Sequence, residues 1–283
     1  MENIWLNGEI VPLAEARIGV EDRGFQFADG IYEVIRLYSG KPFAMAAHLS
    51  RLERSAHGIQ LPLPGGAGFL AAEIARFLER NPLRDGMIYL QVTRGDAPRN
   101  HAFPACKPTI LFYTRTLPPL PDPEKSEGVA LRSVIDERWR RCWIKSIALL
   151  PNVLAKNQAL AAGADEAVFV ENGIVSECAA SNIFFIRNQR LITHPVGPKV
   201  LPGITREYLL RLAGQLAIKV EERGPTESEA VAADEMFITS STREISWVKS
   251  WNGRAVGSGG AGPVTLKLHR ALREAVERET GPI

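Results

Sequence analysis

The sequence predicts a mixed α/β protein of the α+β type, and three observations support this class. Residues 4–11 and 31–45 place apolar strands around Asn-Gly and Ser-Gly turns, which is typical of β-hairpins. Residues 48–59 and 67–78 instead repeat their apolar residues at helical spacing. A proline-rich run at 117–123 separates these elements from a second set of strands and helices, so we expect two domains.

The first domain is expected to span residues 1–117 and to be the smaller one. After its hairpins and helices, residues 87–94 and 109–114 are rich in β-branched and aromatic side chains, which favour strands. Residues 118–123 are expected to form the linker, because proline cannot donate to a sheet and favours an extended chain.

The second domain is expected to span residues 124–283 and to be the larger one. It should contain both strands and helices, as judged from apolar runs and apolar periodicity. The expected strands are 129–134, 167–170, 183–187 and 236–240, and the expected helices are 152–162, 204–216 and 264–278.

Composition excludes several classes of partner. Lys and Arg together number 34 and Asp and Glu 32, so a net charge of +2 gives no electrostatic case for nucleic acid or a membrane surface. The N-terminus lacks the pattern of a secretion signal and no apolar run could span a bilayer, so we expect a cytoplasmic protein. Cys106, Cys142 and Cys178 have no paired spacing and are interpreted as reduced thiols, with no metal site.

One lysine stands in an apolar run. Lys145 lies in the sequence WIKSIALL, and lysine is rarely buried without a partner. In a strand its stem could run along the sheet to water, which is the purely structural interpretation. Desolvation also favours the free amine, which condenses with an aldehyde to a Schiff base. Lys145 is therefore a candidate anchor for pyridoxal phosphate.

Pyridoxal phosphate needs two further features, a carboxylate facing its ring nitrogen and donors for its phosphate. Glu177 closes a short strand ahead of small residues that would let a flat ring approach, although the same position suits a solvated turn. Ile204 opens a helix after Pro202 and Gly203, and the free amides of a helix start suit a phosphate. The same residues also fit an ordinary helix start.

Taken together, these motifs resemble those of the fold-type IV pyridoxal-phosphate enzymes, the class IV aminotransferase family, and within it most closely the D-amino-acid aminotransferases. The resemblance covers nearly the whole chain in order. It rests on residues 21–34, 89–95, 98–104, 138–150, 177–182, 203–206 and 239–242.

The resemblance implies a two-domain fold whose larger C-terminal domain is a mixed, β-barrel-like sheet with helices. It implies that Lys145 holds the cofactor as a Schiff base and moves the proton between substrate and cofactor, and that Glu177 faces the ring nitrogen. The residues implied to bind the phosphate are Arg51, Ile204, Thr205, Ser240 and Ser241.

The resemblance also implies how the substrate is bound. Tyr32, Arg99 and His101 match the residues that capture the substrate carboxylate, with Arg99 and His101 reaching in from the neighbouring subunit of a homodimer. By themselves, the residues of this loop would equally suit a solvated turn. The implied reaction moves an amino group from D-alanine or D-glutamate to pyruvate or 2-oxoglutarate by ping-pong kinetics.

Alternatives within the same fold are the L-branched-chain aminotransferases and the aminodeoxychorismate lyases, which lack the pattern at 99–104. A protein that binds pyridoxal phosphate without catalysis is a further alternative. Two features depart from the family pattern. Ala179 and Ala180 replace serines, and Arg243 stands where a small polar residue is expected and is interpreted as a surface ion pair.

Overall fold

The computed structural model describes residues 2–282. The chain divides into two compact units: Met1–Pro119 with Ile144–Ala148 and Glu277–Ile283, and Leu120–Trp143 with Leu149–Val276. The first unit thus gives way to the second inside the predicted linker. The segment that carries Lys145 belongs to the first unit, although the sequence placed it in the range 124–283, and that division into domains stays a prediction.

The first unit is built on an antiparallel six-stranded sheet. Its first hairpin turns at Asn7 and Gly8, whose φ angles of 51° and 103° are those of a turn that follows the twist of the strands. Both predicted hairpins are confirmed. The strand order is β2 (Glu9–Pro12), β1 (Asn3–Leu6), β6 (Thr109–Thr116), β5 (Gly86–Thr93), β3 (Gly30–Tyr38) and β4 (Lys41–Pro42).

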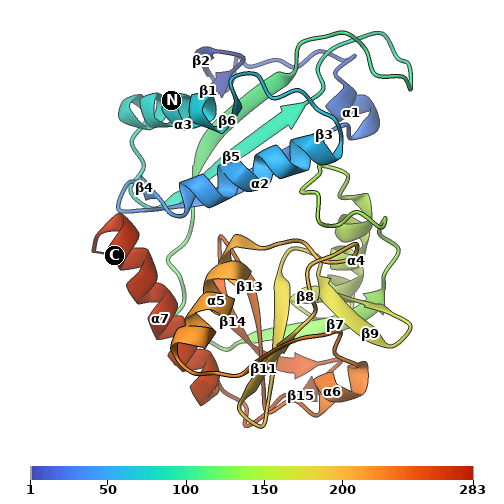
Figure 1. Ribbon diagram of the computed structural model, residues 1–283, viewed down its shortest axis with the longest axis vertical. Coiled ribbons are helices and arrows are strands. Elements are labelled where there is room, and N and C mark those ends of the chain that lie inside the picture. The colour runs from blue at the N-terminus through green and yellow to red at the C-terminus, as the bar shows by residue number, and fades with distance from the viewer. Residues whose placement is uncertain (1, 283) are drawn as a thin grey trace. The chain divides into compact units, whose positions relative to one another are not determined.

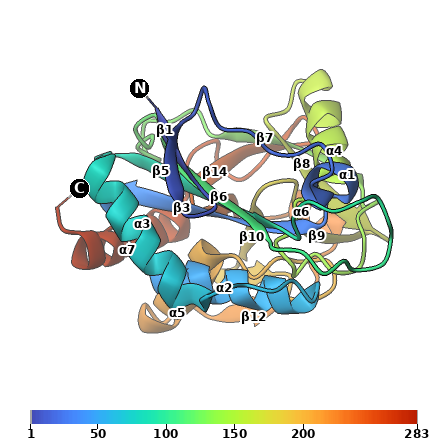
Figure 2. The same cartoon turned by 90° about the horizontal axis from the view of Figure 1, so that it is seen from above.

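Two helices cover one face of this sheet, and a short helix, α1 (Arg23–Phe27), precedes β3. Helices α2 (Met45–Gly58) and α3 (Gly66–Arg80) pack against one another, and α2 runs along β3 (Figures 1 and 2). Under α3, the Trp5 and Phe112 rings stack with centroids 4.7 Å apart, and Phe77 meets Phe112 edge-on at 5.4 Å. This aromatic cluster forms the core between sheet and helices.

The start of α2 differs from the sequence prediction. The second hairpin was expected to reach residue 45, but its strand ends at Pro42 and the helix begins at Met45. Proline lacks the amide that would continue the ladder. The helix start was missed because Ala44, the residue before it, makes no side-chain cap and so leaves no signal in the sequence.

The second unit contains a mixed sheet that curls on itself. Its pairs are mostly antiparallel, but β11 pairs with β12, β14 with β7, and β7 with β8 in parallel. The strand at one end, β9, also contacts β10, so the predicted barrel-like sheet is confirmed. The strand order is β12 (Val220–Glu222), β11 (Arg190–Thr193), β10 (Asn182–Arg187), β13 (Glu235–Ser240), β14 (Glu244–Trp251), β7 (Val129–Ile135), β8 (Glu166–Glu171) and β9 (Ile174–Cys178), with β15 (Arg254–Ala255) beside β14.

Helices cover this curled sheet from outside. α5 (Ile204–Gln215) and α7 (Pro263–Thr280) bury their apolar faces against β10 and β13, where Phe184 and Phe237 stack at 4.9 Å. α4 (Leu150–Ala161) packs on β7 and β8, and α6 (Glu227–Val231) is a single turn. The last residues of α7, from Glu277 onward, group with the first unit. No helix within residues 2–282 is long and apolar enough to cross a membrane.

Candidate active site

A short segment attaches Lys145 to the end of β3. Ser146 forms an isolated antiparallel bridge with Ile31, the Lys145 carbonyl accepts from the Tyr32 amide at 3.0 Å, and the Ile147 amide donates to Gly30 at 3.1 Å. A side chain on Gly30 would lie 2.9 Å from Ile147 Cδ1 and 2.7 Å from a backbone oxygen of β5. Only glycine permits this close approach, so the segment is held as a strand-like edge.

Lys145 also contacts α2, because its backbone amide donates to Ser55 Oγ at 3.1 Å. Pairing with β3 places it beside Tyr32, and its Nζ lies 4.1 Å from the centre of the Tyr32 ring. Tyr32 stacks on Tyr89 at 5.9 Å, and Tyr89 on Tyr113 at 5.3 Å, which gives a row of phenol rings. Burial, Tyr113 and Tyr32 raise the pKa of Tyr89 above its usual value, so its hydroxyl keeps its proton. The roles of Lys145 in binding the cofactor and of Tyr32 in binding the substrate carboxylate stay predictions.

Arg51 lies in α2 and pairs with Glu33 of β3. Its Nε and Nη2 donate to the two oxygens of Glu33, each at 2.7 Å, and His48 Nδ1 lies 2.7 Å from Glu33 Oε2. Burial raises the pKa of Glu33, but Arg51 and His48 outweigh it and hold the pKa below its usual value. Burial lowers the pKa of His48, so this imidazole is neutral and donates from Nδ1.

The sequence did not reveal Glu33 and His48 as partners of Arg51. A signal was present, because Glu33 occupies the buried face of β3 among apolar residues, where a carboxylate requires a cation. Its partner lies on a separate helix, which the sequence alone could not pair with it. The role of Arg51 in phosphate binding stays a prediction, and the observed contacts hold its guanidinium rigidly.

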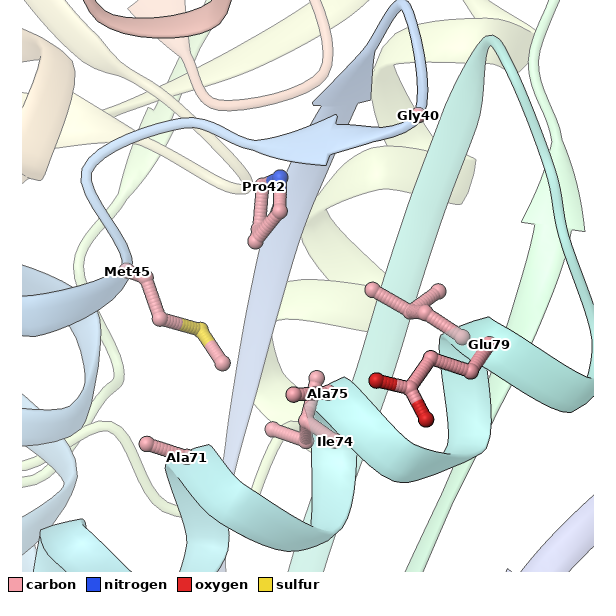
Figure 3. Close-up of a pocket in the computed structure, with 8 residues that line it drawn as sticks. Gly40, Pro42, Met45, Ala71, Ile74, Ala75 and Glu79 are labelled. Carbon is pink, nitrogen blue, oxygen red and sulfur yellow. The ribbon is translucent and has the colours of Figure 1, made fainter.

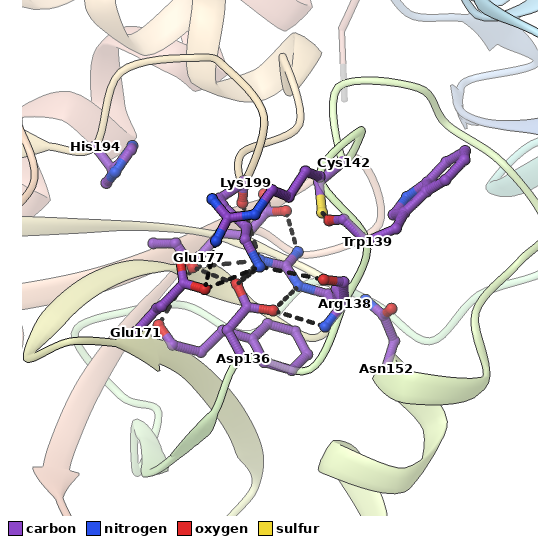
Figure 4. A network of polar contacts seen from close by, with 12 residues as sticks. Asp136, Arg138, Trp139, Cys142, Asn152, Glu171, Glu177, His194 and Lys199 are labelled. Atoms are coloured by element: carbon purple, nitrogen blue, oxygen red, sulfur yellow. Dashed lines mark hydrogen bonds and ion pairs between the residues drawn. The ribbon is translucent and has the colours of Figure 1, made fainter.

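Glu177 lies in the second unit, near the end of β9, and is buried. Arg138 Nη1 donates to its Oε1 at 2.6 Å, while Asn182 Nδ2 and the Leu201 amide donate to Oε2 at 3.1 and 3.0 Å. Both carboxylate oxygens are therefore held, which fixes the plane of the group (Figure 4). The side chain of Glu177, the acid predicted to face the ring nitrogen, is therefore held in one orientation.

Behind Glu177 lies a network of charges that the sequence did not predict. Arg138 Nε and Nη2 donate to Asp136 at 3.0 and 2.9 Å, and Arg138 Nη2 also donates to the Lys199 carbonyl at 2.9 Å. Lys199 Nζ lies 3.6 Å from both Asp136 and Glu171. Burial raises the pKa of Asp136, but Arg138 outweighs it, and the net shift is downward. The pKa of Arg138 is raised, because the effect of Asp136 and Glu177 outweighs that of burial.

The start of α5 and the end of β13, which carry the predicted phosphate donors of the second unit, both lie next to Asn182. Asn182 pairs with Thr239 in the sheet, and a side chain on Gly203, the residue before α5, would lie 1.9 Å from Asn182 Oδ1. The free amides of α5 begin at Ile204, so they and the end of β13 both adjoin Asn182. Thr239 Oγ1 is buried and has no hydrogen-bond partner among residues 2–282. This set of donors fits an anion.

The loop that carries Arg99 and His101 is anchored within the first unit. Arg99 Cζ lies 4.3 Å and the His101 ring 5.4 Å from the Phe27 ring centre, and Arg23 donates to the carbonyls of Asn100 and Ala102. Both side chains are exposed. Within the described chain neither contacts Tyr32, so one copy of the chain does not assemble the predicted carboxylate site by these contacts.

The two departures from the family pattern lie in turns. The Ala179 carbonyl accepts from Asn152 Nδ2 at 2.8 Å, so an amide of α4 supports the turn before β10. Arg243 lies exposed in the turn between β13 and β14. The predicted surface ion pair of Arg243 is not found among the residues that the structure describes. All three cysteines are free, as expected.

An apolar pocket of about 460 Å³ lies elsewhere in the first unit, between the start of α2 and α3 (Figure 3). Pro42, Met45, Ala71 and Ala75 line it, and Glu79 is its one titratable group among the described residues. None of the residues predicted to act on cofactor or substrate faces this pocket. It offers no catalytic chemistry.

Comparison with known sequences identifies relatives over nearly the whole chain. The family model described as amino-transferase class IV matches residues 30–251. A D-alanine aminotransferase of Bacillus licheniformis is 40% identical over 278 residues, which cover 98% of this chain and 98% of that protein.

Comparison with solved structures gives the same fold. A branched-chain amino acid aminotransferase of Escherichia coli matches with a TM-score of 0.91 and 27% identity, covering 99% of this chain and 96% of that one. A second branched-chain amino acid aminotransferase, from T.th. and solved with pyridoxamine 5'-phosphate, matches with a TM-score of 0.90 and 27% identity, covering 99% and 96%. These neighbours have the type IV fold, so the predicted fold class is confirmed.

Proposed function

Because the chain belongs to the class IV aminotransferase family, we propose that it is a pyridoxal-phosphate-dependent transaminase that acts on D-amino acids. The donors would be D-alanine and D-glutamate, and the acceptors pyruvate and 2-oxoglutarate. The observation that carries the proposal is the hydrogen bonding of the Lys145 segment to β3, which places the Lys145 amine 4.1 Å from the centre of the Tyr32 ring. Preference for D-substrates is supported by the D-alanine aminotransferase relatives and by the match of Arg99 and His101.

The residues present fit the cofactor. Lys145 supplies the amine, Glu177 the acid for the ring nitrogen, and the start of α5 an anion site of backbone amides. Thr239 Oγ1, buried without a partner in the described chain, is a hydroxyl that a phosphate or its water would satisfy. Ser240, Ser241 and Arg51 are the further proposed phosphate donors.

When bound, pyridoxal phosphate would supply an electron sink that makes the α-hydrogen of the amino acid acidic. Lys145 Nζ would accept that proton from the α-carbon and pass it to the cofactor, and positioned proton transfer of this kind contributes about 10²–10⁴-fold to the rate. Glu177, held as a carboxylate by Arg138, would keep a proton on the ring nitrogen. The donor would leave as a 2-oxo acid before the acceptor binds, so initial-rate plots should show ping-pong kinetics.

A homodimer is part of the proposal, because the carboxylate site requires Arg99 and His101 of a second copy. In the first unit, Val20 and Phe25 near this loop are 78% and 79% exposed. In the second unit, one face of α4 is apolar and exposed at helical spacing, with Leu150 at 67%, Val153 at 51%, Leu154 at 60% and Leu160 at 52%. Exposed apolar surface of this extent is typical of an interface between subunits.

The test is a spectral titration of cofactor-loaded protein. D-Alanine should change the absorbance of the bound cofactor and release pyruvate, and added 2-oxoglutarate should restore the spectrum while forming D-glutamate. A response to L-leucine but not D-alanine would favour a branched-chain enzyme. Release of pyruvate from aminodeoxychorismate without an acceptor would favour a lyase. An unchanged spectrum with every donor would favour a binding protein without catalysis.

A further inference from the structure

We propose that Arg138 is the positioning residue for Glu177: its guanidinium holds the carboxylate in the plane and charge state in which it meets the cofactor ring nitrogen. This inference rests on the proposed function and deepens it. Arg138 would act through Glu177, without touching the substrate.

The geometry supports this role because Arg138 uses each edge of its guanidinium differently. One edge, Nε and Nη2, forms a fork with both oxygens of Asp136 at 3.0 and 2.9 Å. The remaining nitrogen, Nη1, donates to Glu177 Oε1 at 2.6 Å, and the group lies 4.0 Å over the Phe169 ring. Figure 4 shows Arg138 between the two carboxylates, so the fork to Asp136 aims Nη1 at Glu177. A lysine has no second edge with which to do this.

Charge explains why Asp136 accompanies the pair. A guanidinium facing Glu177 alone would neutralise the negative charge that a protonated ring needs. Asp136 offsets the charge of Arg138, and Lys199, at 3.6 Å, balances Asp136 in turn. Glu177 then receives a directed hydrogen bond and keeps most of its charge.

Stability alone does not require this arrangement. Buried ionic groups are costly to desolvate, and apolar residues of similar volume stabilise a fold as well or better. The side chains of Asp136, Arg138 and Glu177 are exposed by 0%, 4% and 7%, and the latter two carry the pair joined at 2.6 Å. The desolvation cost of burying Arg138 beside Glu177, the acid predicted to face the ring nitrogen, therefore indicates a functional role.

The experiment compares Arg138→Met, Arg138→Lys and the matched control Arg140→Met. Arg140 lies two residues away in the same loop and pairs with Glu171 at 3.3 Å, but its side chain is 74% exposed. Each variant is made in the wild-type and in the Glu177→Gln background. The readouts are the Kd for pyridoxal phosphate, the pH midpoint of the absorbance change of the bound cofactor, kcat with D-alanine, and the melting temperature.

We expect Arg138→Met to weaken cofactor binding and kcat by roughly 10- to 100-fold, the range for loss of a charged hydrogen bond. It should shift the absorbance midpoint in the same direction as Glu177→Gln, and it should add little in the Glu177→Gln background because both changes remove one interaction. Arg138→Lys should fall between wild type and Arg138→Met, and Arg140→Met should match wild type.

The inference would be overturned if Arg138→Met weakened cofactor binding and kcat by the same factor in the wild-type and Glu177→Gln backgrounds. It would also be overturned if the pH midpoint of the absorbance change stayed as in wild type. In either case the transaminase proposal stands. If Arg138→Met does not fold, Arg138→Lys decides by the same two criteria. Wild-type protein that neither binds pyridoxal phosphate nor transaminates D-alanine would remove both proposals.

Discussion

A carboxylate buried on the apolar face of a strand controls how Arg51 is held. Glu33 is fully buried, and two donors stabilise its ionised carboxylate: the Arg51 guanidinium and the neutral His48 imidazole. Arg51 in turn is fixed by the fork it makes with Glu33. In the proposed role as a phosphate ligand, Arg51 would lose little side-chain entropy on binding, because its guanidinium is already held.

Replacing Glu33 with Gln should therefore destabilise the protein strongly at neutral pH. Breaking a buried ion pair costs about 3–5 kcal/mol, because the remaining charge is left without a partner. The folded-state pKa of Glu33 lies below its ordinary value of 4.5, so the stabilising effect of ionised Glu33 is complete above pH 4.5 and is lost as the pH falls below it. The difference in unfolding free energy between wild type and Glu33→Gln should shrink accordingly.

Urea unfolding at several pH values measures this difference. Glu79→Gln is the control, because Glu79 is an exposed carboxylate on α3, and surface substitutions of this kind change stability by less than about 0.5 kcal/mol. A loss below about 1 kcal/mol for Glu33→Gln at pH 7, or one that grows on acidification, would contradict the ion-pair account of this cluster.

Individual residues could be predicted where their chemistry conflicts with their surroundings. Lys145 stood out as a cation in an apolar run, and Glu177 as an acid beside small residues. Arg138 did not stand out, since an arginine near Asp136 in a polar loop is unremarkable in sequence. Its importance depends on β9, which lies 39 positions further along the chain and brings Glu177 to it.

At the scale of elements, the start of α5 depends on a glycine. A side chain at Gly203 would lie 1.9 Å from Asn182 Oδ1, and Asn182 also holds Glu177 Oε2 and the Leu201 carbonyl. One close contact thus links the amides of the helix start to the predicted ring acid.

Gly203→Ala should accordingly weaken binding of pyridoxal phosphate by roughly 10- to 100-fold, because displacements near 1 Å at a site cost factors of this size. Gly214→Ala is the matched control in the same helix, where a new side chain meets nothing within 4 Å. It should leave binding unchanged and stabilise the helix by about 0.5–1 kcal/mol. Titration of apoprotein with cofactor measures both variants, and equal affinities would show that the contact with Asn182 is unimportant.

The long helices could be predicted from sequence, whereas several strands of the second unit could not. Helices α2, α3, α4, α5 and α7 repeat their apolar residues over several turns, so each was located to within a few residues. Strands β11 and β12 have four and three residues, too few to establish a period. Strand β14 is longer, but residues on both of its faces are buried, which removes the alternation that marks a strand.

At the scale of the whole molecule, the account requires two copies of the chain. Lys145 would act with Arg99 and His101 of the other copy, so a site can be rebuilt from two inactive subunits. Lys145→Ala and Arg99→Ala should each be inactive as homodimers. Co-expressed with different tags and purified together, they should recover activity, because each mixed dimer contains one complete site and one doubly defective site.

Random mixing should recover roughly a quarter of the wild-type activity, since half the dimers are mixed and half of their sites are complete. Initial rates with D-alanine and 2-oxoglutarate measure it, and the double variant Lys145→Ala/Arg99→Ala mixed with wild type serves as control. Activity no higher than that of the two inactive parents would show that Arg99 acts within its own chain.

Sequence could establish the family and the two sets of elements, but not how the chain is partitioned. The segment 144–148 follows the linker and precedes α4, so its place in the chain favours the second unit, yet it pairs with β3 of the first. The cause is the hydrogen bonding of three successive residues to one strand end. A linear pattern contains no record of such a long-range pairing.

The central claim is the covalent link between Lys145 and the cofactor, and one measurement tests it directly. Protein saturated with pyridoxal phosphate is reduced with borohydride, digested and mapped by mass spectrometry, with Lys199, a half-buried lysine paired with Asp136, as the internal comparison. The account predicts one pyridoxyl group, on the peptide that contains Lys145. A pyridoxyl group on Lys199 or another lysine, or none on saturated protein, would contradict it.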